Sequence, residues 1–243
     1  MLSLINIRYV LKRNEHVKKA ILSVNDKLPL AAKDALFRKL VNPYSEHEDK
    51  NKVIFVHVPK TAGNSIFQAL YSAHPQGHKE VLRYQKFDRA KFKAYYKFCF
   101  VRNPWDRFVS AYCYLKKGGM GRYDIDFKNK YLNHIDSFDS FISTMSNDPK
   151  YRKSVLSWIH FKPQSFFLCN RNGELMVDYI GYYEKLEICY AELCSSLGVA
   201  AASNLNIVND TQRSDYREYY TDQSRSFIGE IYARDVEMFG YEF

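Results

Sequence analysis

The chain has 243 residues, of which 46% are hydrophobic and 16% aromatic, a composition that excludes a disordered chain and allows one sizeable core. Its formal net charge of +9 indicates an anionic partner. The basic residues are scattered and form no long Lys/Arg block, which argues against a nucleic-acid-binding arm. The five cysteines include no Cys-x-x-Cys pair, so we interpret them as buried thiols of a reducing compartment rather than as disulfides or zinc ligands.

Residues 1–50 are predicted to form a helical appendage, because apolar residues recur at helical spacing around 4–11 and 31–40. The apolar start is interrupted by charged residues, so it lacks the long run of a membrane span, and no signal-peptide cleavage pattern follows. We therefore expect a soluble, cytoplasmic protein. The appendage is interpreted as an accessory cap or a homo-oligomer contact, and the polar stretch 45–52 as a linker to a domain at 51–243.

The first motif is VIFVHVPKTAGNS at 53–65. The apolar, β-branched run 53–58 predicts a buried parallel strand that Pro59 ends, and a helix is expected to begin near Asn64. A strand that turns through Gly63 into a helix directs backbone N–H groups and the positive end of the helix dipole toward one spot. This arrangement predicts an anion-binding loop.

Side chains of the same loop strengthen this prediction. Lys60 adds a mobile positive charge, and Thr61, Asn64 and Ser65 add side-chain donors. The pattern GxxxxGK[ST] of nucleoside-triphosphate loops places its lysine after the second glycine, whereas Lys60 precedes Gly63. An early lysine suits a donor whose transferred group is gripped without a metal.

The second motif is FVRNPWDRFVSAY at 100–112. A short strand is expected over 98–101, followed by a helix in which Asn103 is the N-cap and Pro104 the first residue. Arg102 then stands at the strand end, the usual ligand-binding edge of an open α/β sheet. An arginine at this edge, together with the hydroxyl of Ser110, can hold a second phosphate.

Further elements are expected along the rest of the chain: helices near 136–146 and 150–159, a hairpin around 170–174, a strand near 177–180, and helices at 184–197 and 222–239. Strands that alternate with helices predict an α/β fold. We expect a P-loop-like, open and mainly parallel sheet flanked by helices.

Together, the two motifs resemble the PAPS-binding elements of carbohydrate sulfotransferases, a group that includes the chondroitin, HNK-1 and heparan 2-O-sulfotransferases and bacterial relatives. PAPS is 3′-phosphoadenosine 5′-phosphosulfate. The resemblance extends over about 53–243 and includes PQSFFL at 163–168, DYIGYYEKLE at 178–187 and IYARDVEMFGYEF at 231–243. It implies a sulfotransferase that moves the sulfuryl group from PAPS to a hydroxyl of a saccharide-type acceptor, with no metal required. The missing membrane anchor favours a bacterial-type relative.

The resemblance also implies roles for individual residues. The segment that holds the 5′-phosphosulfate would comprise Lys60, Thr61, Ala62, Gly63, Asn64 and Ser65, and the 3′-phosphate would contact Arg102 and Ser110. Asn64 departs from a threonine that is common at this position, although its amide can still donate to a phosphate. Lys60 would also neutralise the charge that grows on the leaving phosphate during transfer.

The base that takes the acceptor proton is expected to be a histidine, because histidine titrates near neutral pH. His78 lies in a Gly-His stretch that resembles the one in heparan 2-O-sulfotransferases, where the histidine is the base. His74 and His160 remain alternatives, with Glu80 as a carboxylate candidate, and His57 is interpreted as a core residue of the strand.

Several other features have two interpretations. Arg213 and Arg217 are interpreted either as ligands for an acidic sugar or the 3′-phosphate, or as part of a solvated helix face. The tyrosine pairs at 95–96, 182–183 and 219–220 either stack on adenine or sugar rings or belong to the core. Two other functions also fit the sequence: a nucleotide kinase or NTPase with a phosphate loop, and a non-catalytic polyanion-binding module.

Overall fold

A computed structural model of the chain describes residues 42–75, 77–201, 205 and 214–243. The chain divides into two compact units. In its described part, the smaller unit comprises residues 42–54 and 82–95, and the larger unit comprises the described residues of 55–81 and 96–243. The predicted appendage at 1–50 lies outside the described residues except for 42–50, and the domain boundary at 50/51 stays a prediction.

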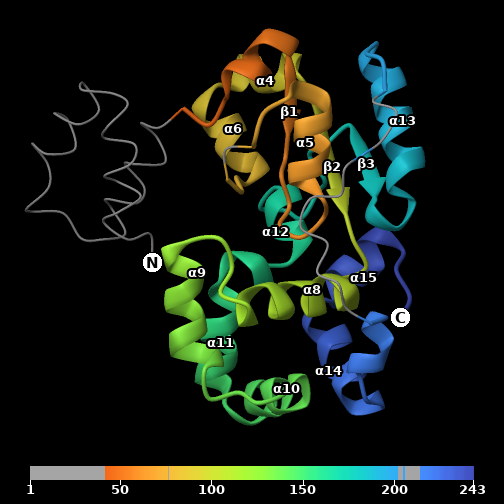
Figure 1. Ribbon diagram of the computed structural model, residues 1–243. Helices are drawn as coiled ribbons and strands as arrows, with labels where there is room; N and C mark the ends of the chain where they lie inside the picture. Colours follow the sequence, from red (N-terminus) through yellow and green to blue (C-terminus); the bar gives the residue numbers. More distant parts are fainter. Residues whose placement is uncertain (1–41, 76, 202–204, 206–213) are drawn as a thin grey trace, which may run out of the picture. The chain divides into compact units, whose positions relative to one another are not determined.

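Helices and strands carry the labels of Figure 1, which begin at α4. The strands are β1 (Val53–Phe55), β2 (Tyr96–Val101) and β3 (Tyr179–Tyr182). The α-helices are α4 (Glu46–Asn51), α5 (Gly63–Tyr71), α6 (Val81–Phe87), α7 (Arg89–Ala94), α8 (Pro104–Lys116), α9 (Arg122–Phe127), α10 (Phe138–Asn147), α11 (Pro149–Ser157), α12 (Gln164–Leu168), α13 (Leu186–Leu197), α14 (Asp222–Ile231) and α15 (Ala233–Phe239). Short irregular helices are η1 (Lys128–Leu132), η2 (Ile159–Phe161), η3 (Tyr183–Lys185) and η4 (Tyr216–Tyr219).

In the smaller unit, the polar stretch 45–52 forms helix α4, so its interpretation as a linker is wrong. Ser45 and Glu48 make a reciprocal capping box, in which the Ser45 side chain accepts from the Glu48 N–H and the Glu48 side chain accepts from the Ser45 N–H. The buried Glu48 carboxylate also accepts a 3.1 Å hydrogen bond from the Tyr84 hydroxyl. The capping box and the buried Glu48 carboxylate therefore stabilise a helix in this segment despite its polar composition.

The three strands form one sheet in the order β1-β2-β3, and β2 and β3 pair in parallel with Phe98 opposite Tyr179 and Val101 opposite Tyr182. This open sheet flanked by helices confirms the predicted α/β fold. Strand β1 is shorter than the expected run 53–58. The ladder continues to Val56, whose N–H donates to the Phe98 carbonyl, but the next carbonyl, that of His57, accepts from the His78 ring instead.

The main core of the larger unit surrounds helix α8, which packs with α10, α11 and α14 in the lower half of Figure 1. Phe108 and Phe141 stack with their ring centroids 5.8 Å apart, and both rings are almost completely buried. The start of α8 follows the sequence prediction, since the Asn103 side chain accepts from the Trp105 N–H and Pro104 is the first helical residue.

Other elements agree in part with the predictions made from the sequence. The hairpin around 170–174 is a turn closed by one antiparallel bridge between Cys169 and Leu175. The helix expected at 222–239 is divided at Tyr232 into α14 and α15. Helices α6, α7, α9 and α12 have five to seven residues each and were not predicted, because so short a segment carries little periodic signal.

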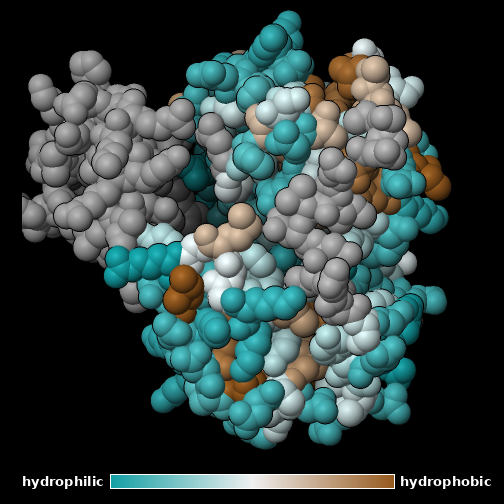
Figure 2. Space-filling view, in the orientation of Figure 1, coloured by the Kyte–Doolittle hydropathy of each residue, from teal (hydrophilic) through white to brown (hydrophobic). Residues whose placement is uncertain are grey.

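The face shown in Figure 2 is mainly hydrophilic, and hydrophobic residues gather over α13. Ile188 in α13 and Val199 just after it are among the exposed large hydrophobic residues. None of the helices in the described part of the chain has the length and apolar character needed to span a bilayer.

The contact between Gly181 in β3 and Phe100 in β2 gives a test of the packing. A Cβ atom at Gly181 would overlap the ring of Phe100, which is completely buried. We predict that Gly181→Ala lowers the free energy of unfolding by about 1–3 kcal/mol, measured by urea denaturation. Gly121→Ala is the matched control, since a Cβ there meets no atom within 4 Å, and equal stability of the two variants would contradict the prediction.

Candidate active site

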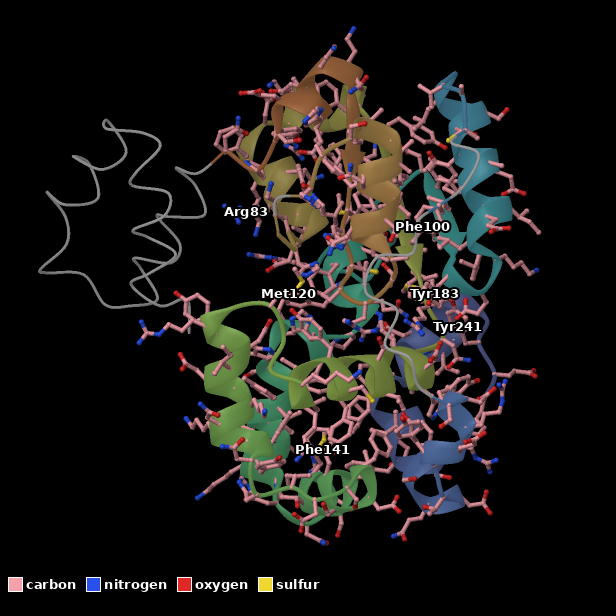
Figure 3. The ribbon with its side chains drawn as sticks, viewed as in Figure 1. Arg83, Phe100, Met120, Phe141, Tyr183 and Tyr241 are labelled. Atoms are coloured by element: carbon pink, nitrogen blue, oxygen red, sulfur yellow. The ribbon has the colours of Figure 1, made fainter. Side chains whose placement is uncertain are left out.

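One cavity in the larger unit lies where strands β1 and β2 end. The residues that line it come from both sequence motifs, from α8 and from later segments: His57, Lys60, Ala62, Gly63, Asn64, His78, Arg102, Ser110, Tyr114, Met120, His160 and Tyr183. In Figure 3, the labelled side chains of Met120 and Tyr183 lie on opposite sides of the region above α8. Two cations, three imidazoles and the start of a helix therefore face one space.

The loop between β1 and α5 has an unusual backbone. Lys60 and Ala62 both have left-handed backbone angles, with φ of 69° and 61°. Residues other than glycine rarely adopt this conformation, which costs free energy and is often found at functional sites. A chain that turns in this way directs successive N–H groups into a concave, anion-binding surface, next to the first turn of α5. Ala62 caps this helix without a side-chain hydrogen bond, and its first turn contains no acidic residue.

Gly63 is needed in this loop because of a close contact rather than its backbone angles. A Cβ atom at Gly63 would overlap the imidazole ring of His57. His57 is buried, as expected for a core residue, but its ring also lines the cavity. The absence of a side chain at Gly63 therefore allows the start of α5 to pack closely against the His57 ring.

Arg102 connects the two motifs. Its Nη1 atom donates to the carbonyl oxygen of Lys60 at 3.2 Å, and its Nε atom donates to the Asp106 carboxylate at 2.7 Å. The guanidinium also lies over the ring of Tyr183, 3.8 Å from the ring centroid. These contacts hold a nearly buried cation in one orientation at the cavity wall.

The backbone of Arg102 is held by a second set of buried polar groups. The Gln164 side chain accepts from the Arg102 N–H at 2.9 Å and donates to the Arg102 carbonyl at 2.8 Å. In turn, the Asp235 carboxylate accepts from the backbone N–H groups of Gln164 and Ser165. Gln164 and Asp235 are both fully buried, so the end of β2 is fixed by α12 and α15.

Lys60 lies over an aromatic ring. Its Nζ atom is 4.0 Å from the ring centroid of Tyr114, which follows Ser110 by one turn of α8. The Tyr114 hydroxyl donates to the Asp124 carboxylate at 2.7 Å. Gly119 allows this contact, because its φ is 63° and the Asp124 side chain occupies the place of a Cβ atom.

His78 has a defined tautomer. Its Nδ1 atom lies 3.0 Å from the carbonyl oxygen of His57, and a carbonyl only accepts, so Nδ1 carries the proton. Nε2 is then the unprotonated nitrogen. Burial, together with His57, His160 and Lys60, lowers the pKa of His78 well below its ordinary value, so the ring is neutral at neutral pH.

The structure brings together most of the residues that the sequence predicted for the site. Lys60, Ala62, Gly63, Asn64, His78, Arg102 and Ser110 all line the cavity. Thr61 and Ser65 do not line it; both are buried, and the Thr61 hydroxyl donates to the Val58 carbonyl, which braces the loop. Their roles and that of His78 stay predictions.

The remaining candidate residues from the sequence lie in different places, some at the cavity and some away from it. His160 lines the cavity, whereas His74 is exposed and does not. Of the tyrosine pairs, 182–183 contributes Tyr183 to the cavity. Arg217 is exposed beside Asp215, and Arg213 lies outside the described residues.

Three residues of the site were missed. Tyr114 had a signal in the sequence, since it follows Ser110 by four residues on the same helix face. Met120 and Asp124 had no signal in the sequence other than the Gly118-Gly119 pair that precedes them. In the described part of the chain, no group of three or more His, Cys, Asp or Glu side chains is placed to hold a metal ion.

Comparisons with known proteins show the family of the chain. A model of the sulfotransferase family matches residues 47–242, so the chain belongs to the sulfotransferase family. An uncharacterized protein of Archaeoglobus fulgidus is 31% identical over 127 residues, which cover 52% of this chain and 87% of that protein. A crystal structure of mouse sulfotransferase SULT7A1 complexed with PAP has a TM-score of 0.44 and 14% identity, and the match covers 82% of this chain and 88% of that one.

Because several histidines are buried, we expect the free energy of unfolding to decrease in acid. Burial lowers the pKa of His57 from 6.5 to about 3. Between these two pH values the unfolded chain binds a proton at His57 that the folded protein does not, so the free energy of unfolding falls as the pH falls. The slope for a single group is roughly 1 kcal/mol per pH unit.

We predict that His57→Gln reduces this slope, measured by urea denaturation between about pH 7 and about pH 5. His78 and His160, whose pKa values are also lowered, maintain part of the slope in the variant. His74→Gln, at an exposed histidine, is the control and should keep the slope of the unaltered protein. The same slope in His57→Gln would show that His57 is not a buried neutral group.

Proposed function

We propose that the protein transfers the sulfuryl group of PAPS to a hydroxyl of a saccharide-type acceptor. The observation that carries the proposal is that one cavity is lined by residues of both predicted anion-binding motifs. Lys60 and the start of α5 belong to the first, and Arg102 and Ser110 belong to the second. A donor that is phosphorylated at both its 5′ and 3′ positions requires two anion-binding groups.

At the 5′ end, the loop from Lys60 to Asn64 receives the phosphosulfate. Its N–H groups and the positive end of the α5 dipole complement the negative charge. The Lys60 ammonium neutralises the charge that develops on the phosphate oxygen as the bond from sulfur to that oxygen breaks. Tyr114 keeps this ammonium beside the cavity before the donor arrives.

At the 3′ end, Arg102 and Ser110 hold the phosphate. Asp106 and the Lys60 carbonyl orient the guanidinium, so that the donor meets a charged group that is already in place. This pre-organisation reduces the entropy lost on binding. Because the guanidinium contacts the Lys60 carbonyl, occupation of the two ends is mechanically linked.

His78 takes the proton of the acceptor hydroxyl at Nε2 while the hydroxyl oxygen attacks sulfur opposite the leaving phosphate. The hydrogen bond from Nδ1 to the His57 carbonyl fixes the ring for this role. The saccharide acceptor is supported by the resemblance of both motifs to carbohydrate sulfotransferases. The cytoplasmic location and a homo-oligomeric contact through residues 1–50 remain predictions from the sequence.

The donor site is tested by ligand-induced shifts in melting temperature. Adenosine 3′,5′-bisphosphate (PAP), the product of the donor, should raise the melting temperature more than adenosine 5′-monophosphate, because only PAP carries the 3′-phosphate. Ser110→Ala should weaken PAP binding by about tenfold or more and leave the monophosphate almost unchanged. Arg102→Lys should weaken PAP binding more than monophosphate binding, and it should affect both ligands because it also removes the contact with the Lys60 carbonyl. Lys60→Ala should weaken both ligands.

Arg171→Ala is the control for these variants, since Arg171 is exposed and does not line the cavity. ATP–Mg²⁺ and heparin test the two rival functions. A shift with ATP–Mg²⁺ but none with PAP would support a nucleotide kinase or NTPase. A shift with heparin alone would support a polyanion-binding module, and either result would overturn the proposal.

The catalytic base is tested separately. We predict that His78→Ala abolishes transfer of labelled sulfate from PAPS to a panel of saccharides, because no group then accepts the hydroxyl proton at that position. PAP binding should survive, since His78 is not placed in either phosphate-binding group. His134→Ala is the control at an exposed histidine, and full turnover in His78→Ala would remove His78 from the mechanism.

A further inference from the structure

His160 is a rigidly held histidine of the cavity that the mechanism above does not use. It lies in η2 and is 8% exposed. The fully buried guanidinium of Arg107 donates to the carbonyl oxygens of His160 and Lys162, at 3.2 Å and 2.6 Å, and so fixes the backbone within η2 and directly after it. A histidine on such a backbone has little freedom to swing into solvent.

The two ring nitrogens of His160 have different surroundings. Nε2 lies 3.4 Å from a carboxylate oxygen of Asp124. Nδ1 is buried and has no hydrogen-bond partner among the described residues. With the Nε2 proton directed at the carboxylate, Nδ1 is a buried, unprotonated acceptor of a residue that lines the cavity. A buried acceptor without a partner is unfavourable until a donor reaches it.

Asp124 is suited to stabilise a charged imidazole. Its carboxylate accepts from the Tyr114 hydroxyl at 2.7 Å and from the Met120 N–H at 3.3 Å, which fixes its position. Burial acts to raise the pKa of Asp124, but the contacts with His160, Tyr114 and Met120 outweigh it, and the pKa lies below its ordinary value. The carboxylate is therefore ionised at neutral pH.

The charges around the cavity histidines distinguish His160 from His78. The rings of His57 and His160 and the Lys60 ammonium oppose a positive charge on the His78 ring, and only the hydrogen bond with the His57 carbonyl favours it. His160 is faced by Lys60 and by Arg107 from α8, which also oppose a charge, but Asp124 from α9 favours it, and Tyr114 from α8 packs against the ring. Burial nevertheless lowers the pKa of His160, so the ring is neutral before reaction.

We propose that His160, paired with Asp124, is the final acceptor of the proton that His78 removes from the acceptor hydroxyl. The rings of His78 and His160 lie edge to face with centroids 5.8 Å apart, and the proposed transfer places one water between their nitrogens. The inference rests on the proposed sulfuryl transfer and assigns a second histidine and a positioning carboxylate to it.

In the transfer, each bond that forms is accompanied by one that breaks, and the proton has a defined path. The acceptor oxygen forms a bond to sulfur, and the bond from sulfur to the phosphate oxygen breaks, with its electron pair remaining on PAP. The acceptor proton passes to Nε2 of His78 and then to Nδ1 of His160. His78 returns to its neutral form with Nδ1–H on the His57 carbonyl, and the His160 imidazolium is stabilised by the Asp124 carboxylate until the proton leaves to solvent.

The experiment compares Asp124→Asn, His160→Gln and the control Asp126→Asn, an exposed aspartate on the same helix. The release of PAP from PAPS, with water or a saccharide as acceptor, is measured against pH, and PAP binding is followed by thermal shift. NMR of the imidazole nitrogens gives the pKa and tautomer of His160. PAP binding within about twofold of the unaltered protein shows that a variant is folded with an intact donor site.

We expect kcat to fall about tenfold or more in Asp124→Asn and His160→Gln, while KM for PAPS stays unchanged. In Asp124→Asn, the pKa of His160 and the acid limb of the kcat profile should both move to lower pH, because the carboxylate that favours the imidazolium is gone. A fall in kcat without movement of the acid limb, or an unchanged pKa of His160, would overturn the proposal.

Failure of this inference is distinguishable from failure of the proposed function. If the unaltered protein binds PAP and turns over PAPS, and Asp124→Asn matches Asp126→Asn in rate and pH profile, only the role of His160 and Asp124 is overturned. If the unaltered protein neither binds PAP nor consumes PAPS, both proposals are overturned.

Discussion

The hydrogen bond from the Arg102 guanidinium to the Lys60 carbonyl is the contact on which the site depends. It joins the loop after β1 to the end of β2, so that Lys60 and Arg102, which are 42 positions apart in the sequence, line one cavity. The carbonyl that accepts this hydrogen bond belongs to Lys60, whose backbone is left-handed with φ of 69°. The contact requires a fixed β2 end, which Gln164 and Asp235 provide.

Both cations of the cavity rest on tyrosine rings: Lys60 on Tyr114 and Arg102 on Tyr183. A ring face attracts a cation and binds water weakly, so it holds the charge without fully neutralising it. An anionic donor can then exchange the contact of Lys60 with the Tyr114 ring for a stronger one. The positive net charge of the chain adds a longer-range attraction for the same anion.

Much of this site was predictable because its chemistry lies in two short segments. Pro59, Gly63, Asn103 and Pro104 mark the turn and the helix start through local backbone preferences, and local preferences are visible in a sequence. The contacts that complete the site are different in kind. Gln164 and Asp235 act by hydrogen bonds to residues far away in the sequence, and Asp124 contacts the distant His160. Nothing beside these residues in the sequence indicates their partners. The capping box of α4 was missed for another reason, since a polar composition concealed a local signal that was present.

The buried hydrogen bonds of Gln164 also bear on how the protein folds. They connect residues 62 and 71 positions apart, and Asp235 belongs to the last helix of the larger unit. Contacts at such sequence separations form late, because long loops must close before they are made. The cavity is therefore complete only when folding of this unit is complete. A nucleotide that fits it acts on the fully folded state, so it slows unfolding and leaves the early steps of folding unchanged.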